Sequence, residues 1–187
     1  MPPREHVDLA RRARFERLFA DVYEPLQRFV RRRADAAVVD DVVAETLLVL
    51  WRRLDDVPEA ALPFCYGTAR RCLANAWRAD ERRDRLTRRV ANEPVPVDGA
   101  GDDADAELIA ALEELSAEDR EIVRLWAWEQ LAPREIAVVL AISPNAASIR
   151  LHRAKRRLAD RLGSRKDGAA AGHNPAGDHA GRTEEGA

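Results

Sequence analysis

The stretch that decides the fold is Leu131–Leu158, LAPREIAVVLAISPNAASIRLHRAKRRL. Its first part, Pro133–Leu140, spaces Ile136, Ala137 and Leu140 so that they share one apolar helix face. Ala141, Ile142 and Ser143 form a short break. Ser143 and Pro144 predict the start of a second helix, because a serine hydroxyl can cap the first turn and proline needs no N–H there. Two helices joined by so tight a turn predict a helix-turn-helix.

The second of these helices has chemically different faces. Its inner face carries small and apolar residues at spacings of four, three and four, namely Ala147, Leu151, Ala154 and Leu158. Its other faces carry polar and basic residues, namely Asn145, Ser148, Arg150, Arg153, Lys155, Arg156 and Arg157. Amide and hydroxyl groups can read base edges and arginines can bind phosphates, so the helix is suited to a DNA groove. The alternative is an amphipathic hairpin whose basic face is merely solvated.

Charge is distributed unevenly along the 187 residues, and the formal net charge of −2 averages unlike segments. Residues 1–90 and 131–166 are net basic, at +4 and +7, whereas residues 91–130 carry −10 and residues 167–187 carry −3. Two basic segments separated by an acidic one predict two surfaces for a polyanion.

The composition and patterning predict an all-α protein of two small helical domains. Aromatic residues make up only 5% of the chain, and no region alternates with a period of two, so strands are not expected. Residues 8–90 predict a four-helix bundle. Its helices are a first one from Asp8, followed by Leu26–Arg33, Ala36–Leu54 and Pro63–Arg89. The third has a buried stripe of Val39, Val43, Leu47, Leu50 and Leu54.

A second helical unit is expected at residues 105–162. Residues 91–104, ANEPVPVDGAGDDA, contain two prolines, two glycines and no apolar period, and so predict a flexible acidic linker. Helices are expected over Asp105–Leu115 and over Ala117–Glu129, the latter capped by Ser116 and burying Ile122, Leu125 and Trp126. The helix-turn-helix completes this unit. The tail at residues 163–187 has no apolar face and is expected to be disordered.

The sequence gives no sign of catalysis or of a bound metal. It contains no Gly-rich phosphate loop, nucleophile motif or cluster of metal ligands, so neither a catalytic residue nor a cofactor is expected. Cys65 and Cys72 are expected to be packed thiols, because seven residues of helix separate them by about 10 Å. No apolar run is long enough for a membrane span or a signal peptide, which predicts a cytoplasmic protein.

Three stretches resemble the bacterial RNA polymerase sigma factors, in particular the extracytoplasmic-function (ECF) group. Val39–Trp51, VDDVVAETLLVLW, looks like the family's "AEDLVQETFLRAW", the helix that docks on the polymerase clamp. Phe64–Arg83, FCYGTARRCLANAWRADERR, is similar to the segment that melts and reads the −10 promoter element. Leu112–Leu158 resembles the domain that reads the −35 element. Their order and spacing extend the resemblance over residues 10–162.

The resemblance implies functional residues in each stretch. Core polymerase would be bound by one face of the clamp-docking helix, consisting of Asp41, Glu45, Leu48 and Arg52. The −10 element would be bound by Arg71, Asn75, Arg78, Arg82 and Arg83. A flipped −10 base would be captured at the loop over residues 55–63, and Trp77 could stack on a base or pack against the bundle. The −35 element would be bound by Asn145, Ser148, Arg150, Arg153 and Arg157.

The chain departs from the family pattern at several of these positions. Arg71 stands where many relatives have Asn and Asn75 where many have Asp, so the −10 sequence preference does not transfer. The −35 preference is open as well, because residues 145–148 differ from the common "vGTVK". Ala141 replaces the usual turn glycine and would cost about 1 kcal/mol if its φ is positive.

The expected function is that of a sigma subunit that binds core RNA polymerase and directs initiation at −35/−10 promoters, for a stress or environmental response. Its expected partners are core polymerase, duplex promoter DNA and the melted −10 strand, and the resemblance allows an anti-sigma factor. Membrane insertion is not expected. The alternative is a helix-turn-helix regulator whose N-terminal bundle senses a ligand or dimerises. The clamp-like helix and the arginine-rich segment favour the sigma subunit, because a sensor bundle needs neither.

Overall fold

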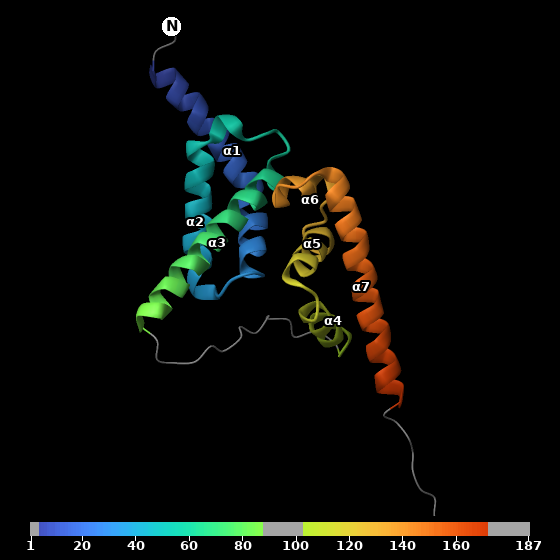
Figure 1. The fold of residues 1–187 in the computed structure, drawn as a ribbon. Coiled ribbons are helices and arrows are strands. Elements are labelled where there is room, and N and C mark those ends of the chain that lie inside the picture. The colour runs from blue at the N-terminus through green and yellow to red at the C-terminus, as the bar shows by residue number, and fades with distance from the viewer. Residues whose placement is uncertain (1–3, 88–102, 172–187) are drawn as a thin grey trace, which may run out of the picture.

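A computed structural model describes residues 4–87 and 103–171. These residues form seven α-helices and one 3-10 turn (Figure 1), and the described part contains no strand. The elements in chain order are α1 (Arg4–Arg31), α2 (Ala36–Arg52), η1 (Leu54–Asp56), α3 (Ala61–Thr87), α4 (Asp103–Glu113), α5 (Ala117–Ala127), α6 (Pro133–Leu140) and α7 (Pro144–Ala171). The all-α class predicted from the sequence is confirmed. The predicted linker at 91–104 lies almost wholly outside the described residues.

The first helix differs from the prediction, because α1 continues through Pro25 instead of ending there. Proline removes one backbone hydrogen bond and normally breaks a helix. Here Val22 precedes Pro25 and Leu26 and Phe29 follow it, and all three are fully buried. Packing on both sides of the proline therefore maintains the helical path, and the N-terminal unit has three α-helices and η1 in place of four helices.

The interior of the N-terminal unit follows the predicted stripes. Val39, Val43 and Leu50 of α2 are buried, and Leu47 is partly buried. Tyr66, Ala69 and Leu73 of α3 are buried, and the Tyr66 ring stacks on Phe29 with centroids 4.7 Å apart. The core thus joins all three helices of the unit, as the spacing of apolar residues predicts.

The C-terminal unit consists of α4 to α7. Ser116 caps α5 as predicted, because its Oγ accepts a hydrogen bond of 3.1 Å from the Asp119 N–H. Ile122 and Leu125 are buried, but the prediction for Trp126 is wrong: its side chain is 41% exposed. The Lys155 ammonium lies 3.8 Å from the Trp126 ring centroid, so a cation–π contact covers this ring at the surface.

The helix-turn-helix has the predicted helix boundaries at its turn. Pro133–Leu140 forms α6, and the Ser143 Oγ accepts a hydrogen bond of 3.1 Å from the Ala146 N–H at the start of α7. Ala141 adopts φ 54° and ψ 46°, the left-handed conformation that favours glycine. At its other end α7 continues to Ala171, so residues 163–171 are helical, contrary to the disorder expected there. Residues 172–187 lie outside the described part.

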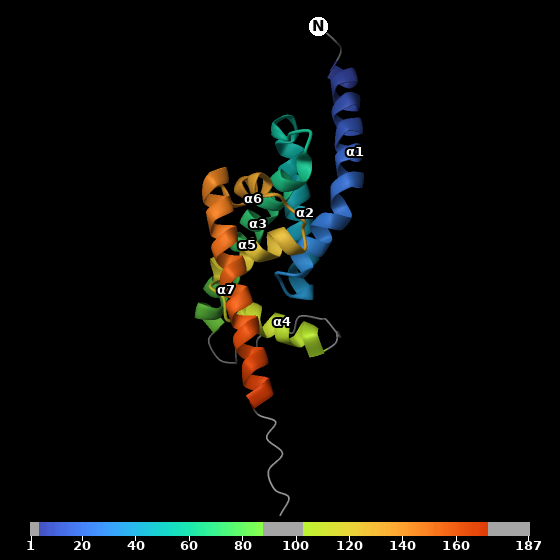
Figure 2. The same ribbon diagram turned by 90° about the vertical axis from the view of Figure 1, so that its right-hand side faces the viewer.

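The two units are packed against each other. In Figure 1, α6 lies beside the N-terminal part of α3, and α7 runs along the far side of α5; Figure 2 shows the same arrangement turned by 90°. One cluster of buried residues includes Tyr66 and Leu73 of α3 together with Ile136 and Val139 of α6. The two predicted helical units therefore share part of their core, which the sequence did not predict.

No helix among the described residues combines the length and the apolar character that crossing a membrane requires.

Candidate polymerase and promoter interfaces

The expected polymerase-binding residues lie together on one face of α2. Asp41, Glu45, Leu48 and Arg52 follow at intervals of four, three and four, and all four side chains are exposed. Leu48 is 54% exposed and lies on the same helix face as the two acids. Asp41 and Glu45 make no ion pair within the described part of the chain. This face therefore offers two unpaired carboxylates and an apolar side chain to a partner.

The expected −10 residues lie on one face of α3. Arg71, Asn75, Arg78 and Arg82 recur at four, three and four and are exposed, whereas the side chain of Arg83 lies outside the described part. The Asn75 Oδ1 accepts a hydrogen bond of 2.7 Å from the Arg78 Nη2, and the Arg78 Nε donates to the Ala74 carbonyl at 3.0 Å. Neutral acceptors thus orient the Arg78 guanidinium and leave its charge uncompensated.

The segment expected to capture a flipped base begins with η1 and leads into α3 at Ala61. Two arginines of α1, some forty residues away, fix it in place. The Arg11 Nη1 donates to the Asp55 carboxylate at 3.4 Å, and the Arg14 Nη2 donates to the Val57 carbonyl at 3.0 Å. Neither arginine is predicted from the sequence, because their three-residue spacing on α1 indicates only a shared helix face.

The expected −35 residues all lie in the first half of α7, but their surroundings differ. Asn145 and Ser148 are exposed near its N-terminus, and the Ser148 hydroxyl donates to the Pro144 carbonyl at 3.1 Å. Arg157 pairs with Asp119 of α5, and Arg150 lies 4.0 Å from Glu118. Among the three expected arginines, Arg153 has no acidic partner in the described residues. Acidic residues of α5 therefore compensate the charge of two of the three expected arginines of α7, Arg150 and Arg157.

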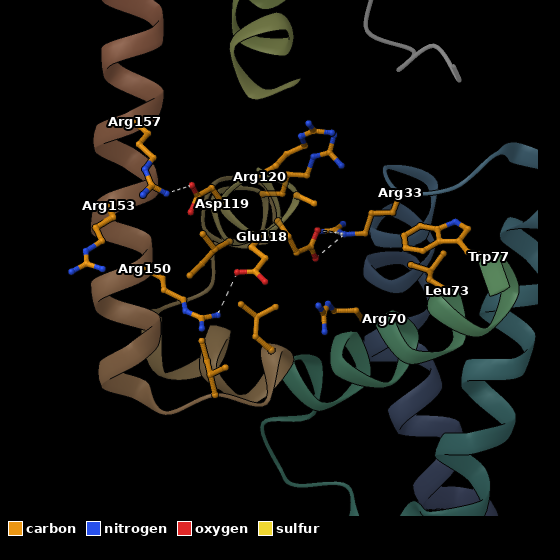
Figure 3. Close-up of a pocket in the computed structure, with 16 residues that line it drawn as sticks. Arg33, Arg70, Leu73, Trp77, Glu118, Asp119, Arg120, Arg150, Arg153 and Arg157 are labelled. Carbon is orange, nitrogen blue, oxygen red and sulfur yellow. Dashed lines mark hydrogen bonds and ion pairs between the residues drawn. The ribbon is translucent and has the colours of Figure 1, made fainter. Parts of the chain in front are cut away.

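A cavity of about 670 Å³ lies between the two units. Figure 3 shows Arg70, Leu73 and Trp77 of α3 on one side and arginines of α7 on the other, with α5 between them. Its lining includes seven arginines and three acids, namely Arg33, Arg70, Arg120, Arg124, Arg150, Arg153, Arg157, Glu118, Asp119 and Glu121. Trp77 is 50% exposed, so this ring borders the cavity instead of packing into the N-terminal core.

Burial and like charge perturb some titratable groups near these surfaces. Burial lowers the pKa of Arg124, and the neighbouring Arg33 guanidinium lowers it further. Burial raises the pKa of Cys65 to about 12 and also raises that of Cys72. Both cysteines are free and buried, which confirms that they are packed thiols.

Comparison with known proteins assigns the chain to a family. Residues 105–158 match the family described as sigma-70, region 4. The chain is 32% identical over 141 residues to the ECF RNA polymerase sigma factor SigL of Mycobacterium tuberculosis, covering 69% of this chain and 77% of SigL. It is 30% identical over 162 residues to the RNA polymerase sigma-E factor of Streptomyces avermitilis, covering 81% and 86%. The chain belongs to the ECF RNA polymerase sigma factors.

The fold agrees with that assignment. The sigma factor RpoE of Bartonella quintana, solved in complex with the anti-sigma factor NepR, superimposes with a TM-score of 0.62 at 22% identity, covering 79% of this chain and 96% of RpoE. As an ECF sigma factor the chain directs the initiation of DNA-templated transcription. This family is not a class of enzymes, and the alternative of a ligand-sensing regulator is not favoured.

Proposed function

We propose that this sigma factor binds core RNA polymerase, the −10 element and the −35 element through three different helical surfaces. The α2 face of Asp41, Glu45, Leu48 and Arg52 binds core RNA polymerase. The α3 face of Arg71, Asn75, Arg78, Arg82 and Arg83 binds and melts the −10 element, and α7 places the protein on the −35 element. One observation carries this proposal. In α2, and likewise in α3, the expected residues whose side chains are described are exposed and lie on a single helix face. The chain that presents these two faces is an ECF sigma factor.

The chemistry of each surface suits its proposed target. Exposed carboxylates without partners on α2 can bind cationic groups of a protein, and Leu48 adds apolar contact area. The α3 arginines can bind the phosphates of a separated strand. If Arg78 binds a phosphate, its hydrogen bond to Asn75 is released, and the Asn75 amide can then hydrogen-bond a base. Asn145 and Ser148 precede the arginines of α7, which matches base contact followed by phosphate contact.

The domain boundaries follow from these roles. Residues 8–90 form the unit for polymerase docking and melting, and residues 105–162 form the unit for −35 recognition, with residues 91–104 linking them. The protein carries out no catalysis of its own and works in the cytoplasm, where polymerase and its template meet. Its regulon serves a stress or environmental response.

A regulatory partner is also part of the proposal. RpoE is bound to the anti-sigma factor NepR and CnrH to the cytosolic domain of CnrY in structures that superimpose on this chain with TM-scores of 0.62 and 0.55. On this likeness we propose that an anti-sigma factor binds the chain described here.

Transcription with purified components tests the proposed function. The protein is added to core polymerase with sheared genomic DNA, and the 5′ ends of the transcripts are mapped. We expect starts that share one pair of upstream elements and that require both core polymerase and this protein. Sequence-specific DNA binding without any polymerase-dependent transcript would instead support the regulator. A variant with Asn75→Ala and Arg78→Ala should retain −35 binding and lose open-complex formation.

A further inference from the structure

The connection between α2 and α3, residues 53–60, has few hydrogen bonds of its own. Its first part contains the 3-10 turn η1, and residues 57–60 form neither helix nor strand. In the described chain, the last backbone N–H before α3 that donates to another backbone group is that of Val57, which lies 3.2 Å from the Leu54 carbonyl. The conformation of the connection therefore depends on contacts with other parts of the molecule.

Arg11 of α1 supplies hydrogen bonds to the end of α2, where the connection begins. The last carbonyls of an α-helix have no N–H partner within the helix. The Arg11 Nη2 donates to the Trp51 carbonyl at 2.8 Å and to the Arg52 carbonyl at 3.4 Å. Its guanidinium also lies over the Trp51 ring, 5.3 Å from the centroid. A cation is favourable at the carboxyl end of a helix, so Arg11 stabilises the point at which α2 ends.

Arg14, one turn further along α1, holds the middle of the connection. Its Nη2 donates to the Val57 carbonyl at 3.0 Å. The Asp55 carboxylate is shared by the two arginines, with one oxygen 3.4 Å from the Arg11 Nη1 and the other 3.6 Å from the Arg14 Nη1. Because the Asp55 side chain is 78% exposed, water screens these ion pairs. The hydrogen bonds to the carbonyls therefore contribute more to the placement of the backbone.

The part of α1 that carries these arginines is itself packed. Phe15 lies beside Arg14 in the sequence and packs edge-on against Trp51, with ring centroids 5.2 Å apart and ring planes at 81°. Phe15 also packs against a buried cluster that contains Val57 and Cys65. This cluster joins α1, the connection and α3. The two arginines thus extend from a packed helix, which limits where their guanidinium groups can lie.

The same arginines reduce the negative charge of the connection. Residues 53–60 contain three acids, which would repel the phosphates of a DNA strand, namely Asp55, Asp56 and Glu59. Asp55 pairs with both α1 arginines, and Asp56 pairs with the Arg53 Nε at 3.0 Å. With two of its three acids paired, the connection can lie against a DNA strand at a smaller electrostatic cost.

We propose that Arg11 and Arg14 are positioning residues for the base that the connection captures from the −10 element. They hold the connection in its capturing conformation before DNA arrives, so less conformational entropy is lost when the base binds. Discrimination at the captured base then depends on both arginines, whereas docking through α2 and −35 binding through α7 do not. This inference rests on the proposed −10 function of the N-terminal unit, with the flipped base captured by this connection.

A pair of double variants isolates the effect of the two arginines. Arg11→Ala combined with Arg14→Ala, the alanine variant, removes both contacts to the connection. Arg12→Ala combined with Arg17→Ala is the matched control, because it removes the same charge from exposed positions of the same helix. Alanine favours a helix in all four positions. Circular dichroism confirms retained helicity, and titration with core polymerase confirms that each variant forms a holoenzyme.

Hydrogen exchange in the free protein tests whether the two arginines order the connection. The Asp56 and Val57 amides donate to carbonyls within this segment, and we expect them to exchange about tenfold faster in the alanine variant than in wild type or the control. Amides in the middle of α3 should exchange at the wild-type rate. Unchanged exchange at Asp56 and Val57 would overturn the proposal, because the connection would then be ordered without the arginines.

Holoenzyme binding to promoters that lack single bases tests discrimination. The promoter is the one mapped in the transcription experiment, and each fragment carries an abasic site at one non-template position of the −10 element. Wild-type and control holoenzymes should lose about tenfold in affinity at the captured position, which is the contribution of one stacked base. The alanine variant should lose less than about threefold there and as much as wild type at every other position.

The pattern over positions separates positioning from a general loss of structure. An alanine variant that binds more weakly overall but keeps the full tenfold loss at the captured position would overturn the inference. So would a variant that loses its sensitivity at every −10 position alike, because the arginines would then support the whole unit. A wild-type holoenzyme that tolerates an abasic site at every −10 position would instead refute base capture, and with it the proposed function of this unit.

Discussion

The candidate binding faces of α2 and α3 present their charged side chains differently from the basic face of α7. On α2 the carboxylates of Asp41 and Glu45 have no ion-pair partner among the described residues, and on α3 the Arg78 guanidinium is held by neutral acceptors. In the C-terminal unit, Arg157 is paired with Asp119 and Arg150 lies beside Glu118. A partner meets uncompensated charge on these faces of α2 and α3, whereas DNA must compete with acids of α5 for Arg150 and Arg157 of α7.

The strongest test of this difference reverses the unpaired acids of α2. We expect Asp41→Lys combined with Glu45→Lys to weaken binding to core polymerase by about 100-fold, or about 3 kcal/mol, because like charges would then face each other across a contact that excludes water. Affinity is measured by fluorescence anisotropy of labelled protein titrated with core enzyme. Folding should be unchanged, since both positions are exposed.

Glu16→Lys combined with Asp21→Lys is the matched control for that change, because both residues are exposed acids on α1. It should bind core polymerase as wild type does. If the α2 and α1 variants bound equally well, polymerase docking through α2 would be wrong, and the comparison between the units would lose its functional meaning.

A smaller effect should separate two arginines of α7. Arg153→Ala should weaken binding to a −35 duplex by about tenfold and reduce the slope of log K against log salt concentration by roughly one, because an arginine without an acidic partner releases one counterion per phosphate contact. Arg157→Ala should change that slope by less than half as much, because Asp119 already compensates its charge. Binding is measured by anisotropy over a range of salt concentrations.

Stability should show the reverse order for these two variants. Arg157→Ala removes a surface pair and should lower the free energy of unfolding by about 0.5 kcal/mol, whereas Arg153→Ala should leave it unchanged. Equal salt slopes for the two variants would mean that the pairing with α5 does not survive in solution.

Local chemistry explains which parts of the fold and site were predictable from sequence. The bounds of α6, the caps at Ser116 and Ser143 and the polar faces of α2 and α3 depend on residues within one or two turns, and all were predicted. The continuation of α1 through Pro25, the exposure of Trp126 and the packing of α3 on α6 depend on distant residues. A periodic pattern shows which face is apolar but does not identify what covers it.

The same distinction applies to the functional side chains. Sequence spacing placed Arg150, Arg153 and Arg157 together on α7 but could not show that acids more than thirty residues away hold two of them. Arg11 and Arg14, which fix the segment after α2, were missed for the same reason. The ion pairs of Arg33 with Glu121 and Glu129 were not predicted because both glutamates lie in the other unit.

A small effect on stability is also expected at the turn that positions α7. Ala141 has φ 54°, which costs an L-residue about 1 kcal/mol relative to glycine. Ala141→Gly should therefore raise the free energy of unfolding by about 0.5–1 kcal/mol, measured by urea denaturation followed by circular dichroism. Ala146→Gly, inside α7, is the control and should lower stability by about as much, because glycine disfavours a helix interior. A stabilised Ala141→Gly variant with unchanged −35 affinity would show that strain in this turn does not help α7 to bind DNA; weaker binding would show that the strained turn sets the orientation of α7.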